Sequence, residues 1–115
     1  MAIAGMDQRA RVKALVLQME QEMRTLDIWS SVAPSAEAMA SEFPFCYDTL
    51  QFDEWLQWVF VPRITSVLEG NGTLPADSDI ASLAEVWFIE QGMELEARPL
   101  VELIRQFDQA ISGEW

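Results

Sequence analysis

The chain has 115 residues, half of them hydrophobic, and a formal net charge of −12 from 19 acidic and 7 basic residues. This length suits one domain spanning residues 1–115, and the hydrophobic fraction argues against disorder. So few Lys and Arg residues argue against direct binding of DNA or RNA, whose phosphates are neutralised mainly by those side chains. A protein partner with a basic surface is the more natural expectation.

Several kinds of chemistry are excluded by residue type, because histidine is absent and Cys46 is the single cysteine. No intrachain disulfide can form, and sets of the Ser-His-Asp, Cys-His and Glu-x-x-His kinds are missing. A zinc site is not expected, and residues 76–79 lack the ligand spacing of a calcium loop. We therefore expect no catalytic set, no metal and no cofactor. Cys46 is interpreted as a small buried apolar residue.

The N-terminal sequence indicates a cytoplasmic protein. Charged residues begin at Asp7, too early to leave room for the apolar core of a signal peptide. No apolar run approaches the roughly 20 residues that a membrane-spanning helix needs.

The first predicted helix covers about residues 7–28, with Asp7 as its N-cap. Its apolar residues recur on one face: Val12, Leu15, Val16, Met19, Met23 and Leu26. A long irregular connection follows. Within it, Ser35 is expected to cap a short helical turn, and residues 42–49 are expected to be extended because Pro44 disfavours helix at Phe43.

The second predicted helix covers about residues 52–69, with Asp48 or Thr49 as its cap. Gly70, Gly72 and Pro75 end it. Its predicted inner face comprises Phe52, Leu56, Val59, Phe60, Ile64, Val67 and Leu68.

A third helix is predicted over about 79–91, capped by Ser78 or Asp79 and ended by Gly92. Its predicted inner stripe is Ile80, Leu83, Ala84 and Trp87. A fourth starts near Pro99 and carries Leu100, Leu103, Ile104, Phe107 and Ile111 on one face. No segment alternates with period two. The sequence thus predicts an all-α fold, a small bundle of about four helices with a long irregular loop between the first and second long helices.

The stretch FDEWLQWVFVPRIT, residues 52–65, concentrates aromatic residues and carries a proline and an arginine near its end. Most of its large side chains should be buried, because exposed patches this apolar are uncommon on monomers. Pro62 should kink the helix and leave the carbonyl of Trp58 without its usual donor. Arg63 is expected to pair with Asp48 or Glu42, or alternatively to hold an anion or a partner's carboxylate.

At FPFCYDTLQFDEWLQWVFVPRI the chain resembles the YqcC-like family of small bacterial proteins. The matching residues are Pro44-Phe45, Asp48-Thr49, residues 54–59 and Pro62-Arg63, and LEGNGTLP also fits. The resemblance covers most of the chain and implies an all-α, bundle-like domain. It also implies a link to a tRNA pseudouridine synthase, whose gene often lies beside those of the family. No synthase feature is present in this sequence.

Two functions are therefore weighed. The first is a non-catalytic protein-interaction module, accessory to a tRNA-modification enzyme such as a tRNA pseudouridine synthase, acting through the tryptophan–arginine region or the acidic face of the third helix. The second is a small-ligand-binding protein or unusual enzyme with a pocket at the Pro62 kink. An exposed apolar face also leaves a homodimer open. The candidate binding residues are Phe45, Tyr47, Asp48, Trp55, Trp58 and Arg63.

Overall fold

The structure is a computed structural model that describes residues 7–70 and 72–112. Residues 1–6, which belong to the N-terminal sequence used to predict a cytoplasmic location, lie outside this range. The helices are α1 (Gln8–Thr25), α2 (Ala36–Met39), the 3-10 turn η1 (Pro44–Cys46), α3 (Phe52–Trp55), the π-helical turn η2 (Leu56–Phe60), α4 (Val61–Glu69), α5 (Ile80–Glu90) and α6 (Arg98–Ile111). The described residues contain no strand, so the predicted all-α class is confirmed.

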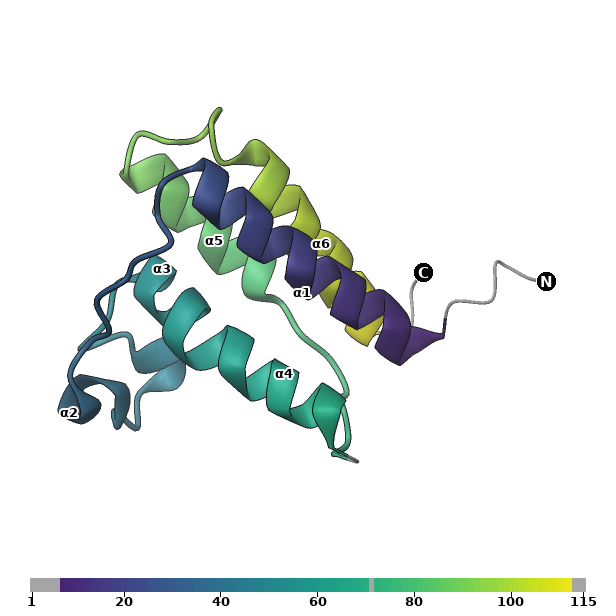
Figure 1. Ribbon diagram of the computed structural model, residues 1–115. Coiled ribbons are helices and arrows are strands. Elements are labelled where there is room, and N and C mark those ends of the chain that lie inside the picture. Colours follow the sequence, from purple (N-terminus) through teal and green to yellow (C-terminus); the bar gives the residue numbers. More distant parts are fainter. Residues whose placement is uncertain (1–6, 71, 113–115) are drawn as a thin grey trace.

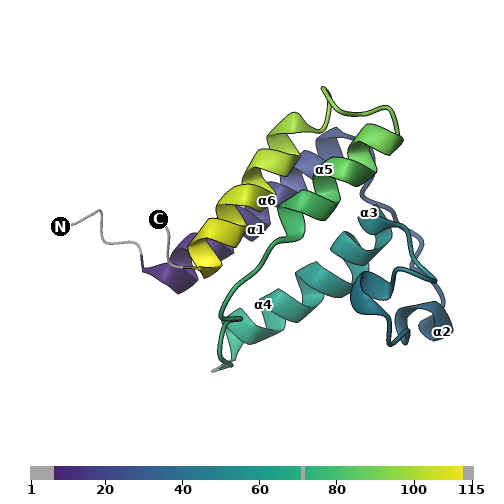
Figure 2. The ribbon, with the colours of Figure 1, turned by 180° about the vertical axis from the view of Figure 1, so that it is seen from behind.

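Helices α1, α5 and α6 lie side by side, and the helical run 52–69 crosses beside them (Figures 1 and 2). The end of α6 is tied to the start of α1, because the Gln8 amide donates to the carbonyl of Ala110 at 2.9 Å. The predicted apolar face of α1 is buried from Val12 to Met23. One core cluster joins these helices, and its fully buried centre includes Leu15, Met19, Leu56, Phe88, Leu100, Ile104 and Phe107.

Local capping agrees with the sequence in α1, α2 and α6. The carboxylate of Asp7 accepts from the Ala10 N–H at 2.8 Å, and the Ser35 hydroxyl accepts from the Ala38 N–H at 3.1 Å. Pro99 lies in the first turn of α6, where its missing N–H costs nothing. The four long predicted helices and the short turn between the first two are all present.

The cap predicted for the second helix is wrong. Its N-cap is Gln51, whose backbone N–H donates to the Glu54 carboxylate at 2.8 Å. Thr49 instead donates its hydroxyl to the carbonyl of Ala38, and Asp48 accepts from Ser41. Both side chains therefore hold the long connection together.

Pro62 was predicted to kink the helix, and the structure has the π-helical turn η2, which ends at Phe60, two residues before this proline. The Val61 N–H reaches back to the carbonyl of Leu56, five residues earlier. A π turn is a common way to absorb a local break in the regular helix ladder. The buried Gln57 in this turn pairs with the backbone of Ser30, accepting at 2.7 Å and donating at 2.7 Å. The long connection is thus bound to the helix at its irregular turn.

An arginine closes the other end of this helical run. The guanidinium of Arg9 in α1 donates to the carbonyls of Val67 at 2.7 Å and Gly72 at 2.9 Å, and makes longer contacts with two others nearby. The last carbonyls of a helix have no partner within it, so Arg9 supplies donors that Gly70 does not.

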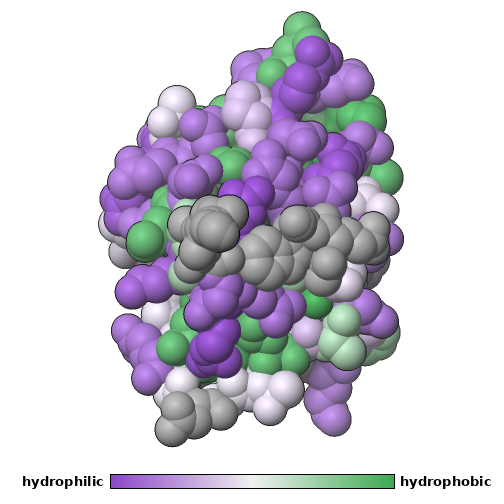
Figure 3. Space-filling view, turned by 90° about the vertical axis from the view of Figure 1, so that its right-hand side faces the viewer, coloured by the Kyte–Doolittle hydropathy of each residue, from purple (hydrophilic) through white to green (hydrophobic). Residues whose placement is uncertain are grey.

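On the face shown in Figure 3, hydrophilic residues dominate and hydrophobic ones gather in the lower part.

Candidate functional site

The segment around Pro44 is not extended, contrary to the sequence-based expectation. It forms the 3-10 turn η1, with Phe45 at φ 59° and Cys46 at φ 50°. Two consecutive bulky residues in the left-handed region are unusual, and such strain persists only where the surroundings hold it. The turn directs Cys46 into the core, as predicted, and leaves Tyr47 76% exposed. The backbone therefore presents aromatic side chains at the surface on both sides of one buried residue.

Helix α5 faces the core with a different stripe from the one predicted. Ala81 and Phe88 are buried along with Ile80 and Ala84, whereas Leu83 and Trp87 are only partly buried. The sequence placed those last two residues in the core. The helix is rotated so that Leu83, Trp87, Glu90 and Gln91 share a side turned away from the core centre.

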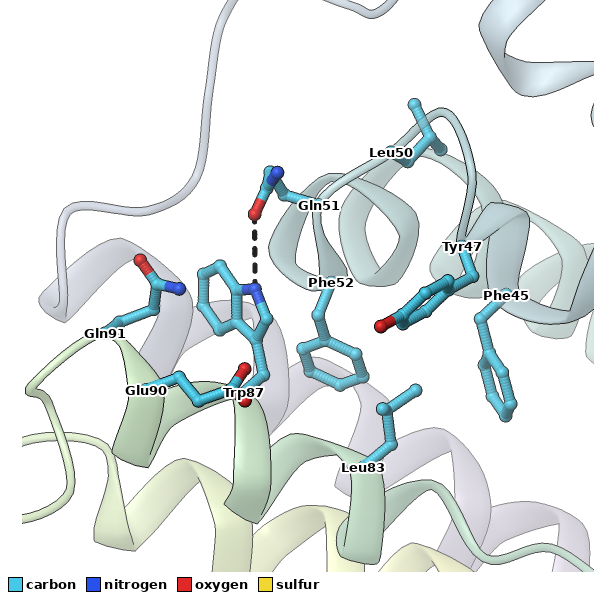
Figure 4. Close-up of a pocket in the computed structure, with 9 residues that line it drawn as sticks. All are labelled: Phe45, Tyr47, Leu50, Gln51, Phe52, Leu83, Trp87, Glu90 and Gln91. Atoms are coloured by element: carbon cyan, nitrogen blue, oxygen red, sulfur yellow. Dashed lines mark hydrogen bonds between the residues drawn. The ribbon is translucent and has the colours of Figure 1, made fainter.

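These two features meet in a hollow of about 280 Å³ between residues 45–52 and α5 (Figure 4). Its lining residues are Phe45, Tyr47, Leu50, Gln51, Phe52, Leu83, Trp87, Glu90 and Gln91. We call this space the aromatic hollow. The rings of Phe52 and Trp87 lie 6.0 Å apart between centroids, and the Trp87 indole N–H donates to the Gln51 amide oxygen at 3.3 Å.

A second hollow of about 390 Å³ adjoins the first and shares Phe45, Tyr47 and Leu83 with it. Its other lining residues are Phe43, Pro44, Asp79 and Ser82. Phe43 is 61% exposed. On α5, Val86 is also exposed and follows Leu83 by one turn. We call the surface made by residues 43–47 and the exposed side of α5 the docking face.

The docking face is apolar in its middle and acidic around it. Glu90 on α5 and, next to the ends of its two segments, Glu42, Asp48 and Asp79 are exposed carboxylates. No Lys or Arg occurs between Arg63 and Arg98. The face therefore has the charge pattern that complements a basic protein surface.

The six predicted site residues do not form one site. Phe45 and Tyr47 line the aromatic hollow, and the Phe45 ring meets the buried Trp55 edge-on at 4.9 Å. Asp48 belongs to the same loop. Trp58 is partly buried and Arg63 is exposed, and neither lines the aromatic hollow. Among the ion pairs of residues 7–70 and 72–112, none joins Arg63 to Glu42 or Asp48, so that predicted pairing is wrong.

Sequence reasoning offered the acidic face of the third helix as a separate surface but did not include Trp87, Glu90 or Gln51 among the candidate site residues. Trp87 was placed on the inner stripe because the spacing of apolar residues on a helix does not show which of two apolar faces packs against the core. The informative signal was the second apolar stripe of the helix, made by Ala81 and Phe88, which satisfies the core without Trp87.

One acidic side chain has a pKa that is shifted by its surroundings. Burial raises the pKa of the Asp53 carboxyl above its ordinary value of 3.8, and a hydrogen bond from the Glu54 N–H partly offsets this. Within the part of the chain that the structure describes, no three acidic or cysteine side chains converge as metal ligands. No helix in that part is both long and apolar enough to cross a membrane.

Comparison with known proteins places the chain in a family. The sequence model of DUF446, described as tRNA pseudouridine synthase C, matches residues 11–110. The chain belongs to this family. An "uncharacterized protein" of Haemophilus influenzae is 38% identical over 86 residues, which cover 75% of this chain and 76% of that protein. The YqcC protein of Escherichia coli is 32% identical over 76 residues, 66% of this chain and 70% of its own length. The YqcC-like resemblance is confirmed.

Two further similarities differ in what they mean. The solution NMR structure of E. coli YqcC has a TM-score of 0.81 and 24% identity, and the match covers 96% of this chain and 92% of that one, which shows a shared fold. A protein named tRNA pseudouridine synthase C from Pectobacterium carotovorum is 37% identical over 70 residues. Those residues are 61% of this chain but only 19% of that protein, so most of the Pectobacterium protein has no counterpart here.

Proposed function

We propose that this protein is a non-catalytic interaction module that binds a basic protein partner through the docking face. The observation that carries the proposal is the exposure of large apolar side chains there. Phe43 and Tyr47 are 61% and 76% exposed, and Val86 is 53% exposed. Contiguous exposed apolar surface with a polar rim is characteristic of protein–protein interaction sites.

The charge of the chain determines what kind of partner fits. With a net charge of −12 the protein repels polyanions and attracts basic surfaces over long range. Carboxylates at the edge of an apolar patch add mainly to the association rate and to specificity, while the apolar centre supplies the affinity. The partner is therefore a protein with apolar side chains surrounded by Lys and Arg.

A tRNA pseudouridine synthase is the partner we propose first. The segment similar to this chain is part of a longer Pectobacterium protein that bears the name tRNA pseudouridine synthase C. Two units that share a chain are held at high effective concentration, which favours a contact between them. An enzyme that handles tRNA also needs basic surface to contact phosphates.

Co-purification of the tagged chain with a tRNA pseudouridine synthase C, at low and at high salt, tests this function. We expect retention at low salt and weaker retention at high salt, because exposed charges are screened. Val86→Asp should weaken retention by placing a charge on the exposed apolar side of α5. Leu17→Asp is the matched control, since Leu17 is a 57% exposed residue on α1. Retention of no protein at either salt concentration would contradict the proposal.

A further inference from the structure

The aromatic hollow has the composition of a site for a cation. Four of its nine lining residues are aromatic: Phe45, Tyr47, Phe52 and Trp87. Phe52 is 6% exposed, and in Figure 4 its ring lies between Trp87 on one side and Tyr47 on the other, with Leu83 next to it. Aromatic faces carry partial negative charge, and a cation held within about 6 Å of a ring centroid is attracted to it.

The polar groups of the hollow are one carboxylate, two side-chain amides, one hydroxyl and the indole N–H of Trp87. The indole N–H of Trp87 donates to the amide oxygen of Gln51, which helps to hold the ring in place. Glu90 follows Trp87 by three residues and so lies on the same side of α5. Among the described residues that line the hollow, its carboxylate is the one charged group, and the other polar side chains there are those of Gln51, Gln91 and Tyr47.

We propose that the aromatic hollow is a receptor for one arginine side chain of the protein partner. The guanidinium would stack on Trp87 and bind the carboxylate of Glu90. This inference rests on the proposed function and adds the residue type that the partner must present. Arginine fits better than lysine because its planar, weakly hydrated guanidinium both stacks on rings and bonds to carboxylates.

The size of the hollow and its neighbour also favour a side chain of a protein. A volume of about 280 Å³ is at or below the small end of the roughly 300–1,000 Å³ typical of pockets for drug-sized ligands. The adjoining hollow shares Phe45, Tyr47 and Leu83 and is available to an apolar residue of the same partner. Arginine and large apolar residues are the usual anchors at the centre of an interface.

The test uses the full chain and small blocked amino acids. N-acetyl-arginine amide is titrated into ¹⁵N-labelled protein, with N-acetyl-citrulline amide as the uncharged analogue of nearly the same shape and N-acetyl-lysine amide as a second cation. The protein has five tryptophans, so the indole N–H signals are few enough to assign, that of Trp87 by its loss in Trp87→Phe. We expect a saturable shift of the Trp87 indole with arginine, a weaker one with lysine and none with citrulline.

Two further variants separate the ring and the charge. Tyr47→Leu changes an exposed residue and so leaves the fold intact, and it should weaken arginine binding by removing one π face. Glu90→Gln should weaken binding about two- to fivefold, as expected for an exposed ion pair worth up to about 1 kcal/mol. Glu69→Gln at the far end of α4 makes the same change in net charge outside the hollow and should have no effect.

The outcomes distinguish this inference from the function beneath it. Equal shifts with arginine and citrulline, or a shift at Trp58 in place of Trp87, would overturn the arginine site. So would co-purification of the partner that is the same for Glu90→Gln, Tyr47→Leu and the unaltered chain, which would leave the proposed function standing. Specific arginine binding with no co-purified partner would instead overturn the function and show that the hollow binds the amino acid alone.

Discussion

The carboxylate of Asp108 in α6 accepts a hydrogen bond from the backbone N–H of Ala81 at 2.9 Å, so that one helix caps another. The same carboxylate accepts from the Ile80 N–H at 3.1 Å and from the Ser78 hydroxyl at 2.6 Å, and Asp108 is only 8% exposed. Ser78 or Asp79 was predicted to cap α5. Asp79 stands at the N-cap position, but its side chain accepts from the Ser82 hydroxyl, and the Ser78 hydroxyl donates to Asp108. The cap therefore fixes α5, and with it Trp87 and Glu90, against α6.

Replacing Asp108 by alanine should destabilise the fold by about 2–3 kcal/mol, because it leaves two buried N–H groups at a helix N-terminus without an acceptor. Urea unfolding followed by circular dichroism measures this change. Asp79→Asn is the matched control and should change the unfolding free energy by less than about 0.5 kcal/mol. Equal effects of the two substitutions would contradict the role of Asp108 as the cap.

Gln57 should contribute to stability. It lies between Trp55 and Trp58, in the motif that the sequence offered as a binding site, but its role in the structure is to hold the long connection. Its amide is the hydrogen-bonding partner of both backbone groups of Ser30. Gln57→Leu keeps the volume but leaves the Ser30 N–H and C=O unpaired, at an expected cost of about 1–3 kcal/mol. Gln18→Leu, at an exposed position of α1, serves as the control in the same urea unfolding experiment. A cost near zero would mean that water replaces the side chain.

The two central tryptophans should behave differently. Trp55 is 8% exposed and contacts Phe45, Phe52 and Phe60, so Trp55→Ala should cost about 3–5 kcal/mol. Trp58 lies partly exposed, outside the buried core, and Trp58→Ala should cost less than about 2 kcal/mol. Thermal unfolding of both variants decides this, and a larger loss for Trp58 would contradict the packing described.

Asp53 should make stability depend on pH. Burial raises its pKa in the folded chain above the ordinary value of 3.8, so the folded state binds the proton more tightly than the unfolded state. The resulting contribution to stability is complete below pH 3.8 and is lost as the pH rises through the raised folded-state value. Asp53→Asn should therefore gain stability relative to the unaltered chain as the pH rises through this window.

Unfolding free energies measured from below pH 3.8 up to pH 7 test this dependence. Asp77→Asn, in an exposed loop, is the control for the loss of one negative charge. A difference between Asp53→Asn and the unaltered chain that shrinks as the pH rises would have the wrong sign.

Sequence patterns predicted what depends on residues close together in the chain. The helices, the Asp7 and Ser35 caps and the end of α5 at Gly92, which adopts φ 73°, all follow from local spacing and backbone preference. The rotation of α5 and its capping by Asp108 depend on how α6 packs against α5. Asp108 and the Ala81 N–H that it accepts from are 27 residues apart in the chain. No local pattern encodes such a relationship.

The candidate site was predicted only in part for the same reason. Phe45 and Tyr47 were identified because they belong to a dense aromatic segment. Their true neighbours, Trp87 and Glu90, come from another helix. Pro62 and Arg63 were interpreted as the centre of the site because a proline followed by an arginine is unusual inside a helix. In the structure the helix continues through this region by way of the π turn Leu56–Phe60.

Amide hydrogen exchange of the chain, with and without a tRNA pseudouridine synthase C, tests the central claim most directly. We expect slower exchange on binding in residues 43–47 and in α5, which carry the docking face, and no change in residues 58–69. Protection centred on Trp58 and Arg63, or no protection anywhere, would contradict the assignment of the docking face as the interaction surface.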